Sequence, residues 1–216
     1  MGTAIAEVPG LFLVHGFLSE EEHDEILTRV ERDILRVDEE QQGRNQAMLF
    51  GNLPSWVDVL AARLLQHPDS LFASPEIRQR DPLFDQMIVN EYWPGDGIVD
   101  HVDLVKFEDG IAGISFGSTC IMTFRRCAST SSGAMATAEA YSTAPEPEQQ
   151  EVHEEVVPPF VEVLLQPGDL ICLSGEARWA WTHGIPARTE DVWQGETLRR
   201  RRRVSITLRR LIQGAS

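Results

Sequence analysis

The sequence has few cysteines and no long hydrophobic run. Its 216 residues contain only three cysteines, Cys120, Cys127 and Cys172, and no Cys-x-x-Cys pair. Such an odd, scattered set is typical of a reducing compartment and argues against a cysteine-based metal site. No apolar run approaches the ~20 residues of a membrane span, and the N-terminal segment lacks the basic start of a signal peptide. We therefore expect an intracellular monomer, cytoplasmic or nuclear, with no membrane partner.

Positive charge is also scarce, and it is unevenly distributed. The chain carries 19 Lys and Arg against 34 Asp and Glu, which gives a formal net charge of −15. Residues 178–216 hold 9 basic and 3 acidic residues, whereas residues 1–177 hold 10 and 31. An acidic body is a poor partner for nucleic acid, because a phosphate backbone is bound by clustered Lys and Arg. A nucleic-acid contact is therefore expected only at Arg199–Arg203, although we interpret Arg199–Arg202 first as a solvated strand face.

Helical patterns come first in the chain, and strand patterns follow. Residues 18–34 begin with a capping box at Ser19 and Glu22, and residues 54–66 repeat apolar side chains at helical spacing. After residue 82, short apolar runs separated by Gly, Pro or Asp are typical of a β-sandwich or jelly roll. The expected strands are 84–92, 98–103, 111–116, 119–126, 160–166, 169–174, 178–183 and 203–210.

These patterns predict a single α+β domain spanning residues 1–216. We expect a helical part over about 1–80 and a β core over about 83–212. Residues 128–156 are rich first in Ala, Ser and Thr and then in Pro and Glu. With little that could form a core, this stretch predicts a disordered insertion between two strands.

His101 and Asp103 stand two positions apart in the expected strand at 98–103. Side chains alternate along a strand, so these two point the same way, with Cβ atoms ~6–7 Å apart, and can converge on one ion. His183, at the end of another expected strand, can supply a third ligand. Two histidines and one carboxylate leave coordination positions open, as in non-haem Fe(II) oxygenases. A structural zinc site would need four closed ligands, and the His-Glu-x-x-His motif of zinc proteases is absent.

A simpler interpretation is that both histidines are hydrogen-bonded core residues and that Asp103 caps a turn. The C-terminal strand favours the metal site over this alternative, because Arg203 and Arg209 fall on one face of it. Their Cα atoms would lie roughly 20 Å apart. When the length of each arginine side chain is subtracted, the remaining distance fits a small dicarboxylate. The planar guanidinium group of arginine binds carboxylates well.

The order and spacing of these segments resemble the AlkB-like Fe(II)/2-oxoglutarate dioxygenases, and in texture the small eukaryotic branch of that family. The family pattern is Asn-x-Tyr, His-x-Asp, a distal His and Arg-x5-Arg. It falls on Asn90, Tyr92, His101, Asp103, His183, Arg203 and Arg209. The stretches "GEAR" at 175–178 and "RNQAMLFG" at 44–51 also look like family segments, so the resemblance covers roughly residues 10–212.

The resemblance implies a double-stranded β-helix with the N-terminal helices packed on one sheet. It implies that His101, Asp103 and His183 bind Fe(II), and that Arg203, assisted by Tyr92, grips the distal carboxylate of 2-oxoglutarate. Asn90 and Arg209 would sit nearer the metal-chelating end. The family uses O2 to convert 2-oxoglutarate to succinate and CO2 while hydroxylating a C–H bond, and a hydroxylated N-methyl group falls apart to an amine and formaldehyde.

Three functions remain open at this point. Repair-type members carry polar or acidic residues just after His-x-Asp, whereas Leu104 and Val105 are apolar here. Together with the acidic body, this favours a dioxygenase acting on a protein or peptide. An RNA or DNA nucleobase N-demethylase is the first alternative, and a non-catalytic jelly-roll binding module is the second. The complete set of metal-binding and arginine positions argues against the binding module.

Overall fold

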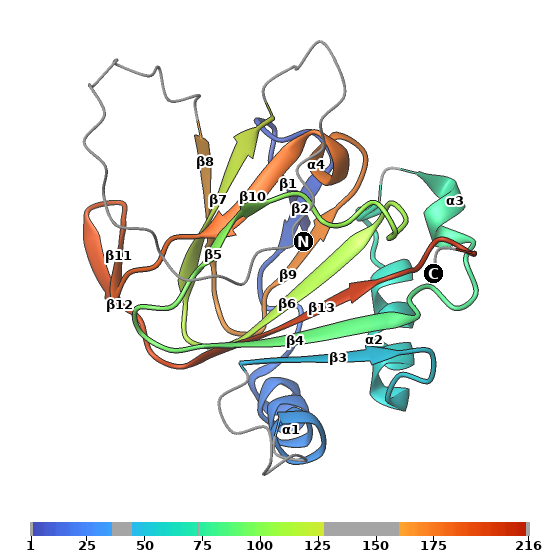
Figure 1. Ribbon diagram of the computed structural model, residues 1–216, viewed down its shortest axis with the longest axis horizontal. Coiled ribbons are helices and arrows are strands. Elements are labelled where there is room, and N and C mark those ends of the chain that lie inside the picture. The colour runs from blue at the N-terminus through green and yellow to red at the C-terminus, as the bar shows by residue number, and fades with distance from the viewer. Residues whose placement is uncertain (1, 36–44, 73, 128–159, 215–216) are drawn as a thin grey trace.

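The computed structural model describes residues 2–35, 45–72, 74–127 and 160–214. Two antiparallel sheets face each other, and helices cover the outer side of the larger one (Figure 1). The predicted α+β jelly roll is therefore confirmed. The insertion predicted at 128–156 lies outside the described residues.

The larger sheet has seven strands in the order β1-β2-β9-β6-β13-β4-β3. In that order, they span Gly2–Ala4, Leu11–Val14, Leu170–Leu173, Ile111–Gly117, Arg203–Arg209, Gln86–Tyr92 and Gln46–Phe50. The first 80 residues were predicted to be helical. They also supply three strands to this sheet, β1, β2 and β3, because these segments pair with β9 and β4.

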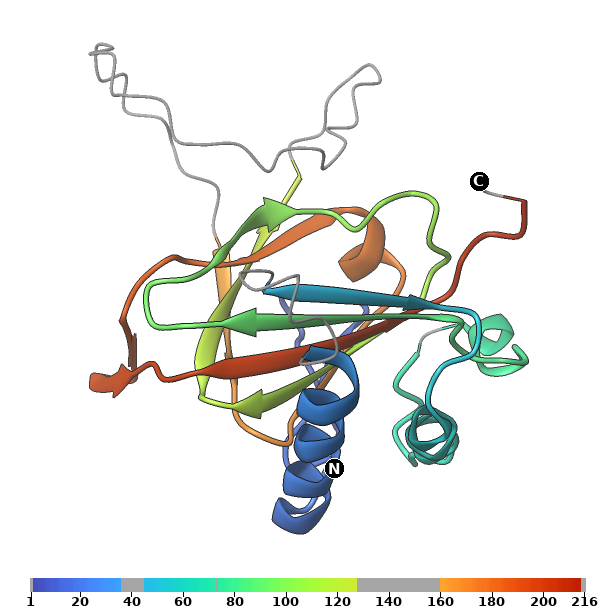
Figure 2. The same cartoon turned by 60° about the horizontal axis from the view of Figure 1, so that its bottom comes forward.

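The smaller sheet has four strands in the order β5-β10-β7-β8. They span Ile98–His101, Trp181–Ile185, Cys120–Arg126 and Phe160–Leu165. A separate two-stranded ribbon is formed by β11 (Glu190–Trp193) and β12 (Glu196–Arg199). This ribbon lies at one end of the molecule, far from the C-terminus (Figures 1 and 2).

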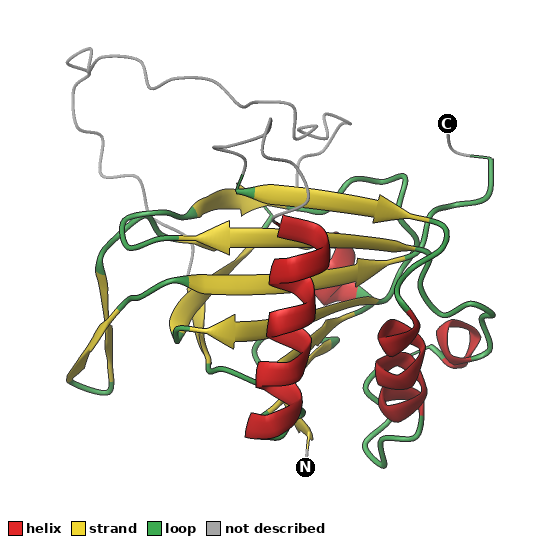
Figure 3. Cartoon of the chain, turned by 90° about the horizontal axis from the view of Figure 1, so that it is seen from below, coloured by secondary structure: helices red, strands yellow, loops and turns green. Residues whose placement is uncertain are grey.

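Two longer helices pack on the outer face of the larger sheet (Figure 3). Helix α1 spans Glu20–Val30 and continues into a π-helical turn, η1, over Glu31–Leu35. The predicted capping box between Ser19 and Glu22 is present, which explains why the helix begins there. Helix α2 spans Ser55–Leu65. No helix in the part of the chain that the structure describes is long and apolar enough to cross a membrane.

Two short helices lie at the edges of the sheets. Helix α3 spans Pro75–Arg78, and α4 spans Glu176–Trp179. The strand expected at 178–183 is therefore wrong in its first half. The backbone amides of Arg178 and Trp179 both donate to the carbonyl of Gly175, which forms a helical turn before β10 begins at Trp181.

Strand β13 separates the apolar core from the candidate site. Val204, Ile206 and Leu208 are buried in the cluster that joins the larger sheet to α1 and α2. The alternate residues, which include Arg203 and Arg209, face the smaller sheet, as expected for a strand with a two-residue period. On the neighbouring strand β4, Arg203 is opposite Tyr92 and Arg209 is opposite Gln86. A second apolar cluster fills the space between the sheets and includes Leu11, Phe124 and Trp181.

Candidate metal centre

His101 and His183 lie opposite each other on neighbouring antiparallel strands. They are Cα partners in the β5–β10 ladder, and their ring centroids are 4.5 Å apart. Asp103 follows two residues later, just beyond the end of β5 rather than on it. The potential ligand atoms of these three residues all lie within 4.8 Å of one another. The structure thus brings together the three residues that the sequence predicts, from two strands and one loop.

Both imidazoles present a lone pair to this space. Nδ1 of His101 lies 2.9 Å from the carbonyl oxygen of Val99. Because a carbonyl only accepts, Nδ1 carries the proton in this contact and Nε2 is left as the coordinating atom of neutral His101. Burial lowers the pKa of His183 to about 4, so this ring is neutral at pH 7. Neutral imidazole is the form that binds metals.

Asp103 is held as a carboxylate by its neighbours. Burial alone would raise its pKa, but the charges of neighbouring cationic groups, of which Arg209 stays charged at neutral pH, more than offset this, so that the pKa lies below the ordinary value. Nη1 of Arg209 donates to Oδ1, while Oδ2 lies 3.5 Å from Nε2 of His183. One carboxylate oxygen is therefore held by the arginine, and the other faces the histidines.

Arg178 supports the loop that carries Asp103. Its side chain is 1% exposed, and it donates to the backbone carbonyls of Asp103, Leu104 and Phe107 at 2.8–3.0 Å. Arg178 belongs to the family-like segment at 175–178, but the sequence did not predict that it supports this loop. Its partners are backbone carbonyl groups 71 to 75 residues away in the chain, which no sequence pattern indicates.

Arg203 lies at the other end of the inward-facing row of β13. It is 4% exposed, its Nη2 donates to Oγ of Ser115 at 2.9 Å, and its guanidinium stands 5.4 Å from the ring centroid of Tyr92. Nε and Nη1 are buried and have no hydrogen-bond partner among the described residues. A buried cation with unused donors fits a carboxylate ligand, since leaving such donors unpaired is costly.

Asn90 lies on the neighbouring strand β4, at the level of Ser205, between the two arginines of β13. It is opposite Ser205 on β13, and its Oδ1 accepts a hydrogen bond from Nε2 of Gln46 on the edge strand β3 at 2.7 Å. Gln46 belongs to the family-like stretch at 44–51. Arg203, Asn90 and Arg209 thus line one side of the space that leads to Asp103.

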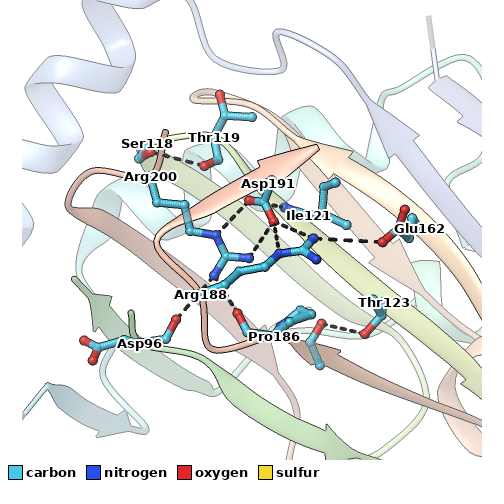
Figure 4. A network of polar contacts seen from close by, with 11 residues as sticks. Asp96, Ser118, Thr119, Ile121, Thr123, Glu162, Pro186, Arg188, Asp191 and Arg200 are labelled. Carbon is cyan, nitrogen blue, oxygen red and sulfur yellow. Dashed lines mark hydrogen bonds and ion pairs between the residues drawn. The ribbon is translucent and has the colours of Figure 1, made fainter. Parts of the chain in front are cut away.

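The basic run does not form the solvated face that the sequence predicts. Arg200 is 8% exposed, and its Nε and Nη2 donate to the two oxygens of Asp191 at 2.7 and 2.8 Å. Arg188 also contacts this carboxylate, and Arg200 reaches the carbonyls of Asp96 and Pro186 (Figure 4). Burial alone would raise the pKa of Asp191, but the hydrogen bonds from both arginines bring it below the ordinary value. The buried carboxylate therefore draws Arg200 inward.

Arg202 is also held by carboxylates. It pairs with Glu31 at the end of α1 and with Glu91 on β4. Arg199 and Arg201 remain exposed. Within the run, interior and exterior positions alternate, as in a strand.

Comparison with known proteins supports the fold and the chemistry of this site. The model of the 2OG-Fe(II) oxygenase superfamily matches residues 39–209. The protein is 31% identical over 219 residues to an "Alkylated DNA repair protein ALKBH8 homolog" from Arabidopsis thaliana, a match that covers 94% of this chain but 59% of that relative. It is 26% identical over 218 residues to a "Probable RNA/DNA demethylase ALKBH6" from Danio rerio, with 93% and 85% of the two chains covered.

A solved structure gives the same picture of the fold. "The structure of OsALKBH1" superposes with a TM-score of 0.61 at 14% sequence identity and covers 97% of this chain and 100% of that one. The chain belongs to the 2OG-Fe(II) oxygenase superfamily and is AlkB-like. The superfamily is named for Fe(II) and 2-oxoglutarate, and the ligand atoms of His101, Asp103 and His183 are of the kinds that Fe(II) accepts.

Proposed function

We propose that this AlkB-like dioxygenase holds Fe(II) through Nε2 of His101, one oxygen of Asp103 and His183. The observation that carries the proposal is the convergence of their ligand atoms within 4.8 Å, from residues that are separated in the chain. Two neutral imidazoles and one carboxylate form the facial set of non-haem iron oxygenases, which leaves room for a cosubstrate and O2.

The cosubstrate 2-oxoglutarate fits the row of polar residues on β13 and β4. Arg203 supplies the buried positive charge and the unused donors for the distal carboxylate, and the Tyr92 ring lies beside it. The Cα atoms of Arg203 and Arg209 are six residue steps apart on the strand, or roughly 20 Å. Asn90 and Arg209 then lie toward the metal-chelating end of the ligand.

The residues of the chain prepare the site for oxidation. Arg209 keeps Asp103 ionised and orients it, the Val99 carbonyl fixes the tautomer of His101, and burial keeps His183 neutral. When bound, iron, 2-oxoglutarate and O2 supply an oxidant that turns a substrate C–H into C–OH, while the cosubstrate leaves as succinate and CO2. If the carbon is an N-methyl group, the hydroxylated product releases formaldehyde and the free amine.

A nucleobase is the substrate that we propose first. The names of the Arabidopsis and Danio relatives refer to DNA repair and to RNA/DNA demethylation. The pocket side of β3 adds a physical argument, because Phe50 is opposite Gln86, on the same face as Arg209, and is 51% exposed. An exposed aromatic ring beside the site is suited to stacking on an unpaired base.

A protein or peptide substrate, which the sequence favours, is the second candidate. The net charge of −15 and the apolar residues Leu104 and Val105 after Asp103 support it. Val105 is 47% exposed, and Met48, two residues from Phe50 on the same face of β3, is 52% exposed. Such an apolar rim can equally contact an unfolded peptide.

A substrate screen separates the two candidates. Purified protein, Fe(II) and 2-oxoglutarate are incubated with N-methylated RNA or DNA oligonucleotides in one arm and with histone or other protein extracts in the other. We expect succinate and formaldehyde in the oligonucleotide arm above the level without substrate. Stimulation by protein extracts alone would replace the nucleobase with the second candidate. An absence of succinate in every arm, with iron present, would contradict the dioxygenase proposal itself.

A further inference from the structure

A groove lies at the Arg203 end of β13. The other end of this strand carries Arg209, which contacts Asp103. The groove is a hollow of about 490 Å³ between the β6–β7 turn and the β12 strand. Its lining includes three hydroxyl side chains and two arginines, Ser118, Thr119, Thr197, Arg199 and Arg201. We call it the Arg199/Arg201 groove. Gly117, which also lines it, pairs with Arg203, so the groove adjoins the cosubstrate end of the strand row.

The two arginines of this groove are unusual in so acidic a chain. Several other cations near the surface pair with carboxylates, as Arg63 does with Glu22 and Arg125 with Asp100. Among the described residues, the guanidinium groups of Arg199 and Arg201 make neither an ion pair nor a hydrogen bond. The neighbouring Arg200 and Arg202 form ion pairs with the carboxylates of Asp191 and Glu31. Because side chains alternate along the chain, Arg199 and Arg201 are left on the same side, with their charges available to a ligand.

The polar groups around these arginines are held in place. The backbone N–H of Arg201 donates to Oγ of Ser118 at 2.9 Å, and that hydroxyl donates to the carbonyl of Thr119 at 3.1 Å. Arg200 fixes the chain between the two arginines through its paired contact with Asp191 (Figure 4). The backbone that carries the two arginines is therefore held by hydrogen bonds at Arg200 and Arg201.

We propose that the Arg199/Arg201 groove binds backbone phosphates of a nucleic-acid substrate, an inference that rests on the nucleobase function proposed above. Guanidinium groups remain charged at any physiological pH and bind phosphate oxygens bidentately, and nearby hydroxyls add neutral donors. Arg203 and Arg209 are six residue steps apart on β13, which corresponds to roughly 20 Å. The groove would therefore hold phosphates several nucleotides away from the reacting base. Such a contact positions the strand without reading its sequence.

The test measures binding of a fluorescent single-stranded RNA 20-mer by anisotropy at 50 and 200 mM KCl. It compares the wild type with the double variant Arg199→Ser/Arg201→Ser. The control, Arg29→Ser/Arg78→Ser, removes the same formal charge from α1, where Arg29 pairs with Glu25, and from an exposed position on α3. We expect the groove variant to bind about tenfold more weakly at 50 mM, with a log–log salt slope smaller by about 1.4, since each phosphate contact on a single strand contributes about 0.7. The control should stay within about twofold of the wild type.

Three outcomes would overturn the groove assignment. The first is an equal loss of RNA binding in both double variants, which would mean that only net charge matters. The second is RNA binding by the wild type that the groove variant retains in full. The third is tighter, arginine-dependent binding of a poly-glutamate peptide than of RNA, which would identify an acidic protein as the partner.

Failure of the proposed function gives a different pattern. The groove lies outside the residues proposed to bind metal and cosubstrate, so the groove variant should keep wild-type binding of Mn(II) and of 2-oxoglutarate. Arginine-dependent RNA binding without turnover of any methylated oligonucleotide would contradict the nucleobase function and support the groove. Turnover of oligonucleotides at equal KM in the wild type and the groove variant would contradict the groove alone.

Discussion

Arg209 donates a hydrogen bond to Asp103 across 106 positions of the chain, and the two side chains are only 10% and 5% exposed. Nε of the same guanidinium donates to Oε1 of Gln86 at 2.7 Å, which fixes the orientation of the arginine. A carboxylate held by a buried cation stays ionised without any metal present. The apoprotein is thus prepared for a divalent ion.

Removal of Asp103 should abolish metal binding. Asp103→Ala takes away the only carboxylate of the cluster and leaves Arg209 as a buried, uncompensated charge. We expect no Mn(II) binding by electron paramagnetic resonance and no succinate formation. Asp100→Ala is the matched control, because Asp100 lies on β5, three residues before Asp103, but pairs with Arg125 at the surface. Mn(II) affinity in the Asp103 variant that equals that of the control would refute the assignment.

Arg203→Ala should specifically weaken the binding of 2-oxoglutarate. Removal of one partner of a buried charge pair costs roughly 3–5 kcal/mol, so we expect the dissociation constant to rise at least about a hundredfold. Calorimetric titration of the Mn(II)-loaded protein measures this directly. Mn(II) binding should be unchanged, and Arg78→Ala on α3 should bind 2-oxoglutarate like the wild type. A wild-type constant in the Arg203 variant would mean that another cation holds the distal carboxylate.

Arg178→Leu should damage both stability and metal affinity. The change leaves the carbonyls of Asp103, Leu104 and Phe107 without their donors, and an unsatisfied buried group costs about 1–3 kcal/mol. We expect a loss of at least about 3 kcal/mol in the free energy of unfolding, measured by urea titration, and weaker Mn(II) binding.

A core variant separates these two effects. Leu60→Ala on α2 removes side-chain atoms from the core and should destabilise by about 2–5 kcal/mol, yet leave the Mn(II) dissociation constant unchanged. If both variants lose affinity equally, Arg178 does not position Asp103.

Glu22 should make stability depend on pH in the acid range. Hydrogen bonds from Arg63 and the Ser19 backbone lower its pKa from 4.5 to about 2. Because the folded-state pKa is depressed, the stabilisation is fully present above pH 4.5 and is lost as the pH falls toward 2. Urea titrations of the wild type and Glu22→Gln should therefore show a gap in unfolding free energy at pH 7 that narrows between about pH 5 and 3. A gap independent of pH would show that the carboxylate charge makes no contribution.

The three cysteines should differ sharply in reactivity. Cys120 and Cys172 are buried, and burial raises the pKa of both thiols, whereas Cys127 is exposed. We expect one fast-reacting thiol per native chain in a disulfide-exchange assay and three after denaturation. Cys127→Ser should remove the fast phase. A second fast thiol in the native protein would show that one of the buried strands opens readily.

Strands that are buried on both faces were among those that could be predicted. Such strands, β6 and β9 for example, appear in the sequence as continuous apolar runs. The strands β1, β2 and β3 of the larger sheet and the two ribbon strands were not found in this way. Met48 and Phe50 of β3 are about half exposed, and only pairing with β4 makes this segment a strand. The ends of β11 and β12 contain Glu and Arg, with no apolar alternation to indicate pairing.

The candidate site shows the same division. The spacing of His101 and Asp103 and of Arg203 and Arg209 is local, so the sequence could place these pairs. The assignment of each to iron or to 2-oxoglutarate stays a prediction. The contacts of Arg200 and Arg202 depend on carboxylates brought near only by folding, including Glu31, which lies 171 positions away from Arg202. The amino-acid composition therefore indicates more positive charge for binding a partner than the folded protein has available, because ion pairs neutralise part of it.

The bond between Arg200 and Asp191 has a consequence for changes in chain length. Strand side chains alternate, so a one-residue slip in β13 would turn Arg203 and Arg209 toward α1 and α2 and bring apolar side chains to the iron site. Arg200 is anchored three positions before Arg203, which sets the phase of the strand. Insertions should be tolerated at the ribbon turn, at Gln194–Gly195, because Arg200 follows this turn and its spacing to Arg203 would not change. A single deletion between Arg200 and Arg203 should remove activity while leaving every proposed ligand in the sequence.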